Sequence, residues 1–261
     1  MEKEYTEINS KAIDSWVENG WEWGVPISHE EYVKAKSGQW RIVLTPRKSV
    51  PAEWLAPFMK NGRMDGVGLL GLASGGGQQM PIFSALGANC TVLDNSDRQL
   101  ENDRMVAKRE GYEICAVKAD MTKRLPFDDE VFDVIFHPVS NCYIEDVYHV
   151  WNECYRVLRK GGILLSGLDY GLNYLFEEDN PLLVVNKLPY NPLKDEELYK
   201  RCIQGDGSLQ FSHSVEEQVG GQLKAGFTLT DLYDDRGTDI LGDYVPAYLM
   251  TRSVKSRFGF G

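Results

Sequence analysis

Three consecutive glycines, Gly75, Gly76 and Gly77, follow a short apolar run that ends at Ala73. Glycine has no Cβ, so such a loop lets the backbone approach a ligand closely. The N-terminus of a following helix then offers unpaired N–H groups to an anionic or carboxylate-bearing group. The structural alternative is a tight turn between a strand and a helix that binds nothing. The glycines therefore indicate a ligand site without identifying the ligand.

Two acidic residues end later apolar runs: Asp94 closes the run 90–94, and Asp120 closes 113–120. Asp94 stands 17 positions after Gly77, where a carboxylate can accept two hydrogen bonds from a ribose diol. The carboxylate of Asp120 can accept from an exocyclic adenine amine. Either acid could instead cap a turn, but a glycine loop and two acids on three successive strand ends favour a ligand that contains adenosine.

The glycine spacing argues against a nicotinamide dinucleotide. The fingerprint G-x-G-x-x-G requires a glycine three positions after its second glycine. That position is Met80 when the pattern starts at Gly75, and Gln78 when it starts at Ala73. Because neither register supplies the third glycine, another adenosine cofactor is the better prediction.

Short apolar runs alternate with amphipathic stretches from about residue 64, which indicates βαβ units and a mainly parallel sheet. Ligands of such sheets bind beyond the carboxyl ends of the strands. Three helices are expected in this region. The first covers 77–86, the second begins at a capping box formed by Ser96 and Gln99 and runs to about Glu110, and the third covers 147–158 and is stopped by Gly161 and Gly162. Seven strands are expected, at 67–72, 90–94, 113–120, 131–137, 162–168, 228–235 and 244–254.

The composition is that of an ordinary globular protein. The 261 residues, of which 43% are hydrophobic, suffice to bury a core without metals or disulfides. The net charge of −11 argues against general nucleic-acid binding. Five scattered cysteines and an acidic N-terminus without an apolar core indicate a cytoplasmic protein. Neither a membrane-spanning run nor a metal-ligand spacing is present, so no membrane and no metal are expected.

In this order and spacing, the motifs resemble those of the class I S-adenosylmethionine-dependent methyltransferases of the Rossmann-like, small-molecule type. GLASGGG resembles the glycine motif, VLDNS and ADM supply the acids after the second and third strands, and LPFDDEVFDVI resembles the fourth-strand region. ECYRVLRKGGILLSG resembles the next helix, glycine turn and strand, and QLKAGF the approach to the sixth strand. The match is strong over 64–168, weaker over 213–235 and absent elsewhere.

Two positions depart from the glycine motif. Gly71 stands where the family has an acid, which puts a contact to the ammonium group of the ligand in doubt. Ser74, Gln78 or the N-terminal segment could replace that contact. Ala73 stands where the family has its first glycine, a change that costs little if its φ is negative.

The resemblance implies an α/β fold: one domain over 1–261 with a seven-stranded, mostly parallel sheet of order 3-2-1-4-5-7-6, strand 7 antiparallel, and helices on both faces. A helical lid (1–60) precedes the cofactor-binding core (64–168), followed by an insertion (170–212) and a closing helix and strands (213–261). The implied cofactor is S-adenosylmethionine. Its expected contacts are Ala73, Ser74, Gly75, Gly77, Gln78, Asp94, Asn95, Asp120, Met121 and His137.

The resemblance implies methyl transfer by in-line displacement at a sulfonium. The enzyme must mainly align the reactants and exclude water, and a base is needed only if the acceptor carries a proton that must leave. His137 is the candidate base, or else its backbone contacts the cofactor. For His213 the structural alternative is capping by Ser212 or Ser214. The tryptophans of the lid could form apolar and cation–π walls near the sulfonium, or else pack on the sheet edge as structure: Trp16, Trp21, Trp23 and Trp40. The candidate substrate contacts are Asn141, Tyr143, His213, Trp16 and Trp40.

A small-molecule acceptor is the leading prediction, because the surface is acidic and the predicted lid is elaborate. The segment HPVSN lacks the D/N-P-P-Y pattern, so amino methylation of a nucleic-acid base is not supported. Methylation of RNA or protein remains an alternative. A second alternative is a non-catalytic sensor or scaffold, because Gly71 replaces the acid of the glycine motif. The acceptor and the oligomeric state stay open.

Overall fold

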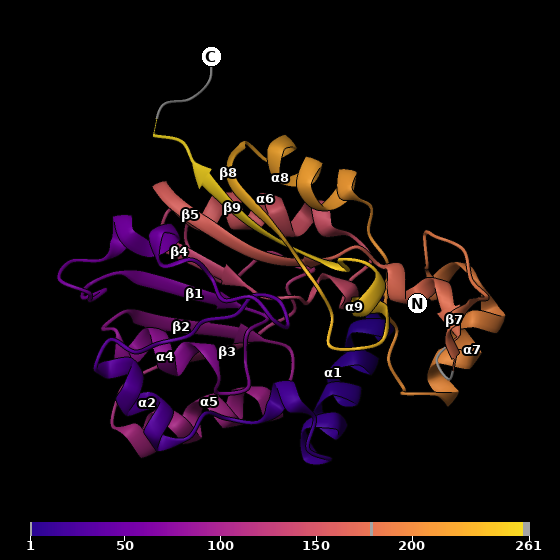
Figure 1. Ribbon diagram of the computed structural model, residues 1–261, viewed down its shortest axis with the longest axis horizontal. Helices are drawn as coiled ribbons and strands as arrows, with labels where there is room; N and C mark the ends of the chain where they lie inside the picture. The colour runs from indigo at the N-terminus through magenta and orange to yellow at the C-terminus, as the bar shows by residue number, and fades with distance from the viewer. Residues whose placement is uncertain (1, 178–179, 258–261) are drawn as a thin grey trace.

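The computed structural model describes residues 2–177 and 180–257 (Figure 1). Residues 178–179, in the expected insertion, and 258–261, in the expected closing segment, lie outside the described residues. A seven-stranded sheet of order β3-β2-β1-β4-β5-β9-β8 forms the centre. Its strands are β1 (Gly68–Leu72), β2 (Asn89–Asp94), β3 (Cys115–Lys118), β4 (Phe132–His137), β5 (Leu158–Asp169), β8 (Phe227–Asp235) and β9 (Tyr248–Lys255).

The strand order confirms the expected 3-2-1-4-5-7-6 arrangement. Strands β1 to β5 pair in parallel, whereas β9 runs antiparallel to both of its neighbours, β5 and β8. The order reverses direction between β1 and β4, because the chain first builds outwards through β2 and β3 and then returns to the other side of β1. An open parallel sheet leaves a crevice at such a switch point.

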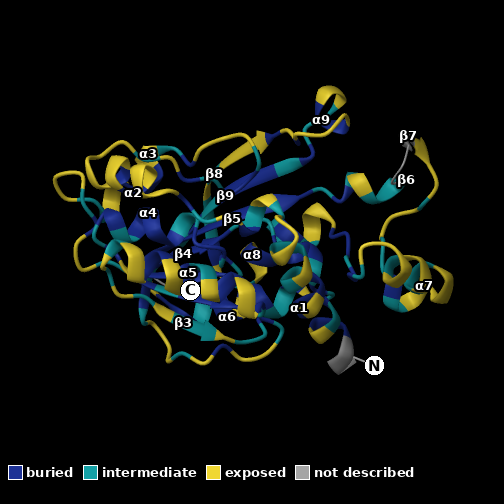
Figure 2. Ribbon diagram, turned by 90° about the horizontal axis from the view of Figure 1, so that it is seen from below, coloured by how far each residue is buried: buried dark blue, intermediate teal, exposed yellow. Residues whose placement is uncertain are grey.

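Helices cover both faces of this sheet, and most strand residues are buried on one face or the other (Figures 1 and 2). Leu69 of β1 packs into the core beneath α2 to α5, whereas the next residue, Leu70, packs into the core beneath α6. The α-helices of the described residues are α1 (Glu2–Glu18), α2 (His29–Lys36), α3 (Ala52–Leu55), α4 (Gln79–Ala85), α5 (Asp97–Glu110), α6 (Val147–Val157), α7 (Glu196–Gln204), α8 (Gly221–Lys224) and α9 (Leu241–Tyr244).

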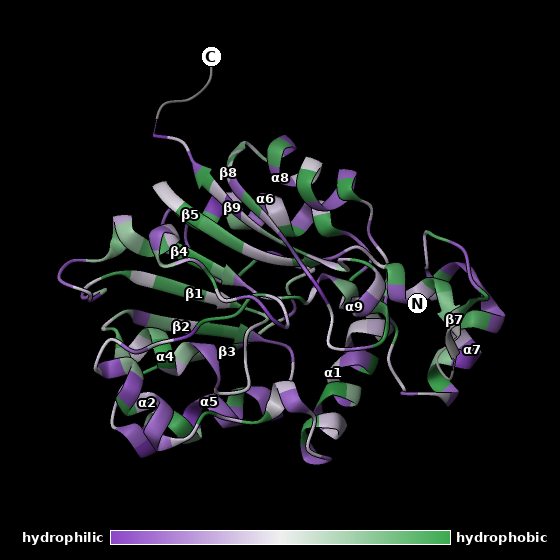
Figure 3. Cartoon of the chain, viewed as in Figure 1, coloured by the Kyte–Doolittle hydropathy of each residue, from purple (hydrophilic) through white to green (hydrophobic). Residues whose placement is uncertain are grey.

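Hydropathy follows the layers: β1 and β4 are coloured largely as hydrophobic and α5 largely as hydrophilic (Figure 3). A two-stranded hairpin beyond β5 belongs, with α7, to a lobe that extends away from the main sheet (Figure 1). Within the described residues, no helix combines the length and apolar character needed to cross a membrane. The shorter elements are β6 (Phe176–Glu177), β7 (Asn180–Val184), the 3-10 helices Glu22–Gly24, Ala56–Phe58, Asn141–Tyr143, Leu172–Leu175 and Pro192–Lys194, and a π-helical turn (Glu216–Gly220).

Three local predictions need correction. The sequence of residues 1–60, rich in Trp, Tyr, Pro and charge, predicts short helices joined by loops, but the segment begins with one 17-residue helix, α1. Helix α6 ends at Val157, before the glycine pair: Gly161, with φ of +84°, lies inside β5, where the pairing with β4 shifts register. The capping box at α5 is half formed, because Ser96 accepts from the amide of Gln99 but the Gln99 side chain donates to Trp23 instead.

The N-terminal segment lies across the carboxyl ends of the strands, held by polar contacts. The side-chain amide of Asn95, just after β2, donates to the carbonyl of Thr6 in α1 at 2.9 Å. Farther along, the carbonyl of Leu44 accepts from the amide of Val139 at 3.2 Å. Residues 43–48 therefore lie over the ends of β4 and β5 as a fixed covering strap.

One carboxylate on β8 fixes this strap. Asp235 Oδ2 accepts from the Thr45 hydroxyl at 2.7 Å and from the amides of Lys48 and Arg47 at 2.9 and 3.0 Å. Burial raises the pKa of Asp235, but these hydrogen bonds outweigh it and hold the pKa below its ordinary value. Thr45 and Asp235 are 190 positions apart in the sequence, so the strap is held in place only when β8 has joined the sheet.

Asp235→Ala should free the strap. Loss of the shared acceptor leaves donors without their partner and should lower the free energy of unfolding by about 1–3 kcal/mol. Amide hydrogen exchange at Arg47 and Lys48 should quicken by about tenfold or more, while exchange in β1 stays unchanged. Asp234→Ala is the control, since this neighbour is exposed and accepts from Tyr170. Unchanged exchange at both amides in Asp235→Ala would contradict the assignment.

Candidate functional site

A cavity of about 300 Å³ lies at the carboxyl ends of β1, β2, β4 and β5, where the strand order reverses. The sheet side contributes Ser74, Gly75, Asp94 and Asp169, and the N-terminal segment covers it with side chains that include Trp21, Trp23 and residues 43–46. A smaller cavity of about 60 Å³ adjoins it at the ends of β2 and β3. The two share Ile13, Ala73, Asp94, Ser140 and Tyr143, so they form one elongated site.

The loop after β1 has a strained start. Ala73 has φ of +48°, a left-handed conformation in which an L-residue costs about 1–2 kcal/mol more than in the right-handed region. From the sequence, alanine at position 73 is expected to cost little if its φ is negative. Because the φ of Ala73 is positive, the expectation of a low cost is wrong. The amide of Ala73 donates to the Leu93 carbonyl at 2.8 Å, and the amide of Gly76 donates to the Gln99 carbonyl at 3.0 Å. The surrounding backbone thus holds the strained residue in place.

The glycine at position 71 has a packing reason. A Cβ on Gly71 would lie 2.5 Å from the sulfur of Met80 and 2.8 Å from its terminal methyl carbon. Met80 is fully buried in α4, so its side chain occupies the space that an acid at position 71 would need. Glycine at position 71 and methionine at position 80 therefore fit each other, which explains why this chain has no acid at position 71.

Asp94 joins the loop to the start of α5. Its Oδ2 accepts from the amide of Gly75 at 3.0 Å, and its Oδ1 accepts from the amide of Ser96 at 2.9 Å. Burial raises the pKa of this carboxyl, opposed by those hydrogen bonds. Each carboxylate oxygen has more than one lone pair, so a residue that lines both cavities still has capacity to accept from a ligand.

Two buried polar atoms beside Asp94 have no protein partner among the described residues. They are the hydroxyl of Ser74 and the side-chain carbonyl oxygen of Gln99, and both residues line the larger cavity. Buried polar atoms are normally hydrogen-bonded, so unpartnered atoms on residues that line a cavity fit a bound polar ligand. At the other end of the site, Asn95, Asp120 and Met121 line the smaller cavity. Asp120 Oδ1 also accepts from the amide of Thr122 at 2.8 Å, so this acid caps its turn as well.

Gln78 and Gly77 mainly hold the N-terminal segment. Gln78 lines the larger cavity, but its side-chain amide donates to the carbonyls of Glu22 and Val25 at 2.7 and 2.9 Å. The Gly77 carbonyl accepts from the amide of Ile27 at 3.0 Å. Gly77 lines neither part of the site, because it lies against Asn102 of α5.

His137 lies elsewhere than expected. Its ring is fully buried outside both cavities, with Nδ1 donating to the Leu72 carbonyl at 2.9 Å and Nε2 lying 2.8 Å from Asn141 Oδ1. The ring meets Trp151 edge-on at 5.9 Å. Burial lowers the pKa of His137 against the effect of these contacts. The ring therefore has a structural role, which Asn141 shares and which does not fit a base, whereas the contact of the His137 backbone with the cofactor stays a prediction.

His213 and Trp40 also take structural places. His213 Nε2 donates to the carbonyls of Asn141 and Ile144 at 3.0 and 2.9 Å, and its ring is buried off the cavity. Trp40 packs against the core on the α2 to α5 face and does not line the site. Trp16 stands one layer back, 6.2 Å from the ring of Tyr143. Tyr143 is the predicted substrate contact that lines both cavities.

Several cavity residues escaped the sequence analysis. Asp169 ends β5 as Asp94 ends β2, so the same rule of acids at strand ends points to it. Tyr174 and Gln210 belong to the insertion, and Tyr248 begins β9. These residues carry no motif, and only the folded chain brings them together.

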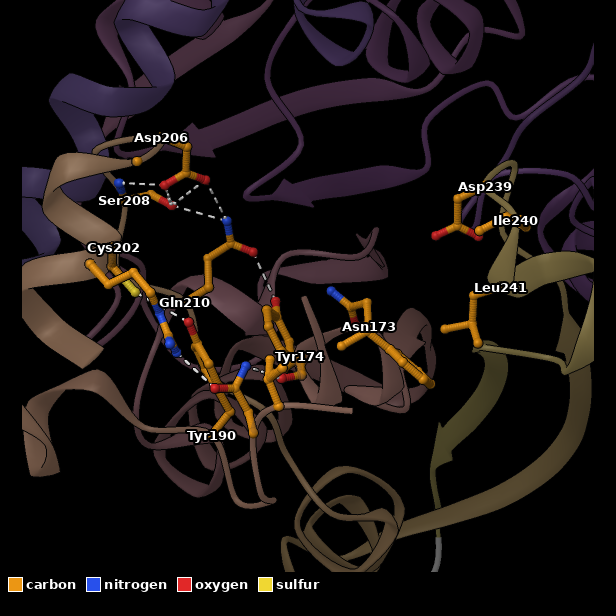
Figure 4. Close-up of a pocket in the computed structure, with 15 residues that line it drawn as sticks. Asn173, Tyr174, Tyr190, Cys202, Asp206, Ser208, Gln210, Asp239, Ile240 and Leu241 are labelled. Atoms are coloured by element: carbon orange, nitrogen blue, oxygen red, sulfur yellow. Dashed lines mark hydrogen bonds between the residues drawn. The ribbon is translucent and has the colours of Figure 1, made fainter. Parts of the chain in front are cut away.

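A larger cavity of about 670 Å³ adjoins the site on the side of the insertion (Figure 4). It shares Asn173, Tyr174 and Gln210 with the cavity at the strand ends. The Tyr174 hydroxyl donates to Gln210 Oε1 at 2.8 Å, and the Gln210 amide donates to Ser208 at 3.0 Å. Tyr174 also stacks on Tyr190, with ring centroids 4.9 Å apart. The insertion thus builds a polar, aromatic-lined chamber next to the candidate cofactor site.

The fold and this site together define a Rossmann-like methyltransferase, and comparison with known proteins agrees. The family described as "Methyltransferase domain" matches residues 70–166. The chain is 45% identical over 253 residues to the "Uncharacterized methyltransferase YbaJ" of Bacillus subtilis (strain 168), covering 95% of this chain and 97% of that protein. The chain belongs to the class I S-adenosylmethionine-dependent methyltransferases, and S-adenosylmethionine is its cofactor.

Solved structures show the same fold at low sequence identity. An S-adenosylmethionine-dependent methyltransferase from Mesorhizobium loti is 19% identical with a TM-score of 0.58, over 78% of this chain and 98% of that one. A geranyl diphosphate methyltransferase in complex with GPP and sinefungin is 16% identical with a TM-score of 0.54, over 78% of this chain and 77% of that one.

Gly71→Ala should test the packing of Met80. The added methyl group would overlap the thioether, so we expect a loss of about 1–3 kcal/mol in the free energy of unfolding. In a Met80→Ala background the same substitution should cost much less, because the overlapping atoms are gone. Urea denaturation of the four proteins gives the coupling. Equal costs in both backgrounds would show that Met80 is not the constraint.

Asp103 of α5 lies fully buried behind the glycine loop, and neither of its carboxyl oxygens has a hydrogen-bond partner among the described residues. Burial raises its pKa to about 8, against a smaller effect of the nearby Gly77 and Gly76 amides. A raised pKa in the folded state means stability that is full below the ordinary carboxyl pKa and is lost as the pH rises towards 8.

Asp103→Asn should therefore remove part of the pH dependence of folding. The neutral amide replaces the protonated acid and does not titrate. The stability of the variant relative to the natural protein should therefore rise by about 4 kcal/mol from pH 5 to pH 8.5. Urea denaturation at both pH values measures this gain. Parallel stability curves for the two proteins would contradict a raised pKa at Asp103.

Proposed function

We propose that this methyltransferase acts on a small molecule held between the cofactor and the chamber of the insertion. The carrying observation is the covered cavity itself: the strap and the tryptophans close the strand-end side, while Asn173, Tyr174 and Gln210 connect it to the chamber. Cavities of these sizes suit small molecules, which proteins commonly bind in concave sites. A polymer side chain would have to pass either the anchored strap or the insertion.

Two further observations favour a small acceptor. The net charge of −11 opposes association with nucleic-acid phosphates. A protein of the same fold, geranyl diphosphate methyltransferase, is described in complex with GPP, a small molecule. The insertion contributes much of the chamber, which fits a role in selecting the acceptor.

The residues present suit S-adenosylmethionine. Asp94 is placed to accept from ribose hydroxyls, and Ser74 offers a buried hydroxyl that needs a partner. Asp120 and Met121 offer a polar and an apolar wall in the smaller cavity, where the adenine is expected. The bound cofactor supplies a methyl group on a positively charged sulfur that leaves as a neutral thioether.

The chain's own task is then alignment and exclusion of water. Trp21 and Trp23 cover the cavity with aromatic surface that can stabilise a cation. The strap is bonded to β8 and to Val139, so it excludes solvent from the strand ends. Well-oriented reactants can gain on the order of 7–11 kcal/mol relative to reaction in solution.

Methyl-labelled S-adenosylmethionine tests the proposal. The protein would be incubated with the small-molecule fraction of a cell extract and, separately, with its RNA and protein fractions. We expect label to enter the small-molecule fraction and to depend on the protein. Transfer into RNA or protein alone would overturn the small-molecule assignment, and transfer into no fraction would favour a cofactor-binding sensor.

Asp94→Ala should weaken cofactor binding. The substitution removes the candidate ribose acceptor and the partner of the Gly75 amide, so the Kd for S-adenosylmethionine should rise about tenfold to a hundredfold, as expected for losing hydrogen bonds to a charged group. Isothermal calorimetry measures the change, with thermal melting to verify folding. Asp97→Ala is the control, because that exposed acid pairs with Lys118 outside the site. A Kd equal to that of the natural protein would exclude Asp94 from the site.

A further inference from the structure

Asp169 is a buried acid whose carboxylate has little hydrogen bonding within the fold. It is the last residue of β5, lies 7% exposed and lines the cavity on the side away from the glycine loop. Among the described residues, its carboxylate has one hydrogen bond, a long one of 3.5 Å from the Gln218 side chain to Oδ1. A buried carboxylate normally has strong partners, because an unpaired one is costly. The other carboxylates at the strand ends, Asp94 and Asp120, both accept from backbone amides.

Groups that surround Asp169 keep it in an uncharged environment. Tyr248 is its cross-strand neighbour on β9, and Cys142, Tyr143 and Tyr174, from the segments after β4 and β5, line the same cavity as Asp169. Burial raises the pKa of all four of these groups, so they stay neutral near pH 7. Burial likewise raises the pKa of Asp169 to about 7, where a carboxylate takes up and releases protons readily.

Gln218 orients the acid. It sits in the π-helical turn Glu216–Gly220, and its amide donates to the Asp169 carbonyl at 2.9 Å as well as to the carboxylate. Its own carbonyl accepts from Asn141 at 2.8 Å, and Asn141 in turn contacts His137. π-Helical turns are rare and often occur at functional sites. The buried histidine thus belongs to a network that ends at the carboxylate in the cavity.

We propose that Asp169 is the general base of the reaction and that the acceptor carries an O–H or N–H group. The inference rests on the proposed small-molecule function. The acceptor's oxygen or nitrogen lone pair forms the new bond to the methyl carbon as the carbon–sulfur bond breaks, and that electron pair stays on sulfur. The acceptor's proton passes to the Asp169 carboxylate and from there to solvent. Asp169 lines the same cavity as Asn173, Tyr174 and Gln210, which also line the chamber, so it can meet an acceptor that arrives from there.

Asp169→Asn tests the proposal because it keeps the shape and removes the base. With labelled S-adenosylmethionine and the small-molecule fraction, turnover should fall about a hundredfold or more, the usual range for a lost general base. The Kd for S-adenosylmethionine should stay within twofold. Asp169→Glu should retain part of the activity. Asp133→Asn is the matched control, since Asp133 lies in β4, away from the cavity, and pairs with Arg159.

A second measurement does not depend on turnover. Infrared difference spectra between the natural protein and Asp169→Asn, recorded without ligand from pH 5 to pH 9, report the protonation of this one carboxyl. We expect its band to change from acid to carboxylate near pH 7. In Gln218→Met the change should move to higher pH, because the hydrogen bond from Gln218 lowers the pKa of Asp169. The acid limb of the rate profile should move in the same direction.

The outcomes separate this inference from the proposed function. Undiminished turnover in Asp169→Asn, a product methylated on an atom that carried no proton, or an Asp169 that is already ionised at pH 5 would each overturn the base assignment. Label that enters only RNA or protein would overturn the proposed function, and the infrared titration would then still decide the state of Asp169. Loss of turnover with unchanged cofactor affinity, together with the shift in Gln218→Met, would establish the base.

Discussion

Asp94, the last residue of β2, and the two residues that follow it hold the site together. Asp94 binds the glycine loop, Asn95 binds α1, and Ser96 both caps α5 and donates to Asp14 of α1. A glycine loop, a helix and a covering segment are thus tied to one strand end. If this corner moved, the floor and the cover of the cofactor cavity would separate. The carboxylate of Asp94 therefore already stabilises the glycine loop and the start of α5 when no ligand is bound.

The sequence predicts the sheet well because strand order and strand ends follow from a regular alternation of apolar runs. The same logic places Ser74, Gly75 and Asp94 on one cavity, and Asp120 beside them. It fails for His137 because a position at a strand end does not give the direction of the side chain. Phe136 packs beneath α4, so the side chain of His137 must point to the opposite face of the sheet, where it contacts Trp151 of α6. Strict alternation along β4, applied to that last residue, would have indicated burial.

Other parts of the site could not be predicted locally. Gly71 and Met80 share one volume although one belongs to a strand and the other to a helix. The chamber residues Tyr174 and Gln210 come from a segment without periodicity or motif, and their positions depend on contacts with distant elements. The sequence identifies Ala73 as a position of the glycine motif, but only the folded structure shows that its φ is positive and its backbone strained. Motifs identify the residues expected at the cofactor, whereas the chamber of the insertion depends on nonlocal packing.

The covering segment has a consequence for the order of assembly. Asn9 exchanges hydrogen bonds with Leu209, 200 positions away, and Thr45 donates to Asp235, 190 positions away. Contacts of such long sequence separation close large loops, which costs chain entropy. We therefore expect the cover to dock on a sheet that has already formed, and docking completes the binding site. A ligand that binds only the completed site stabilises the docked form by mass action, so cofactor supply and maturation of the chain are linked.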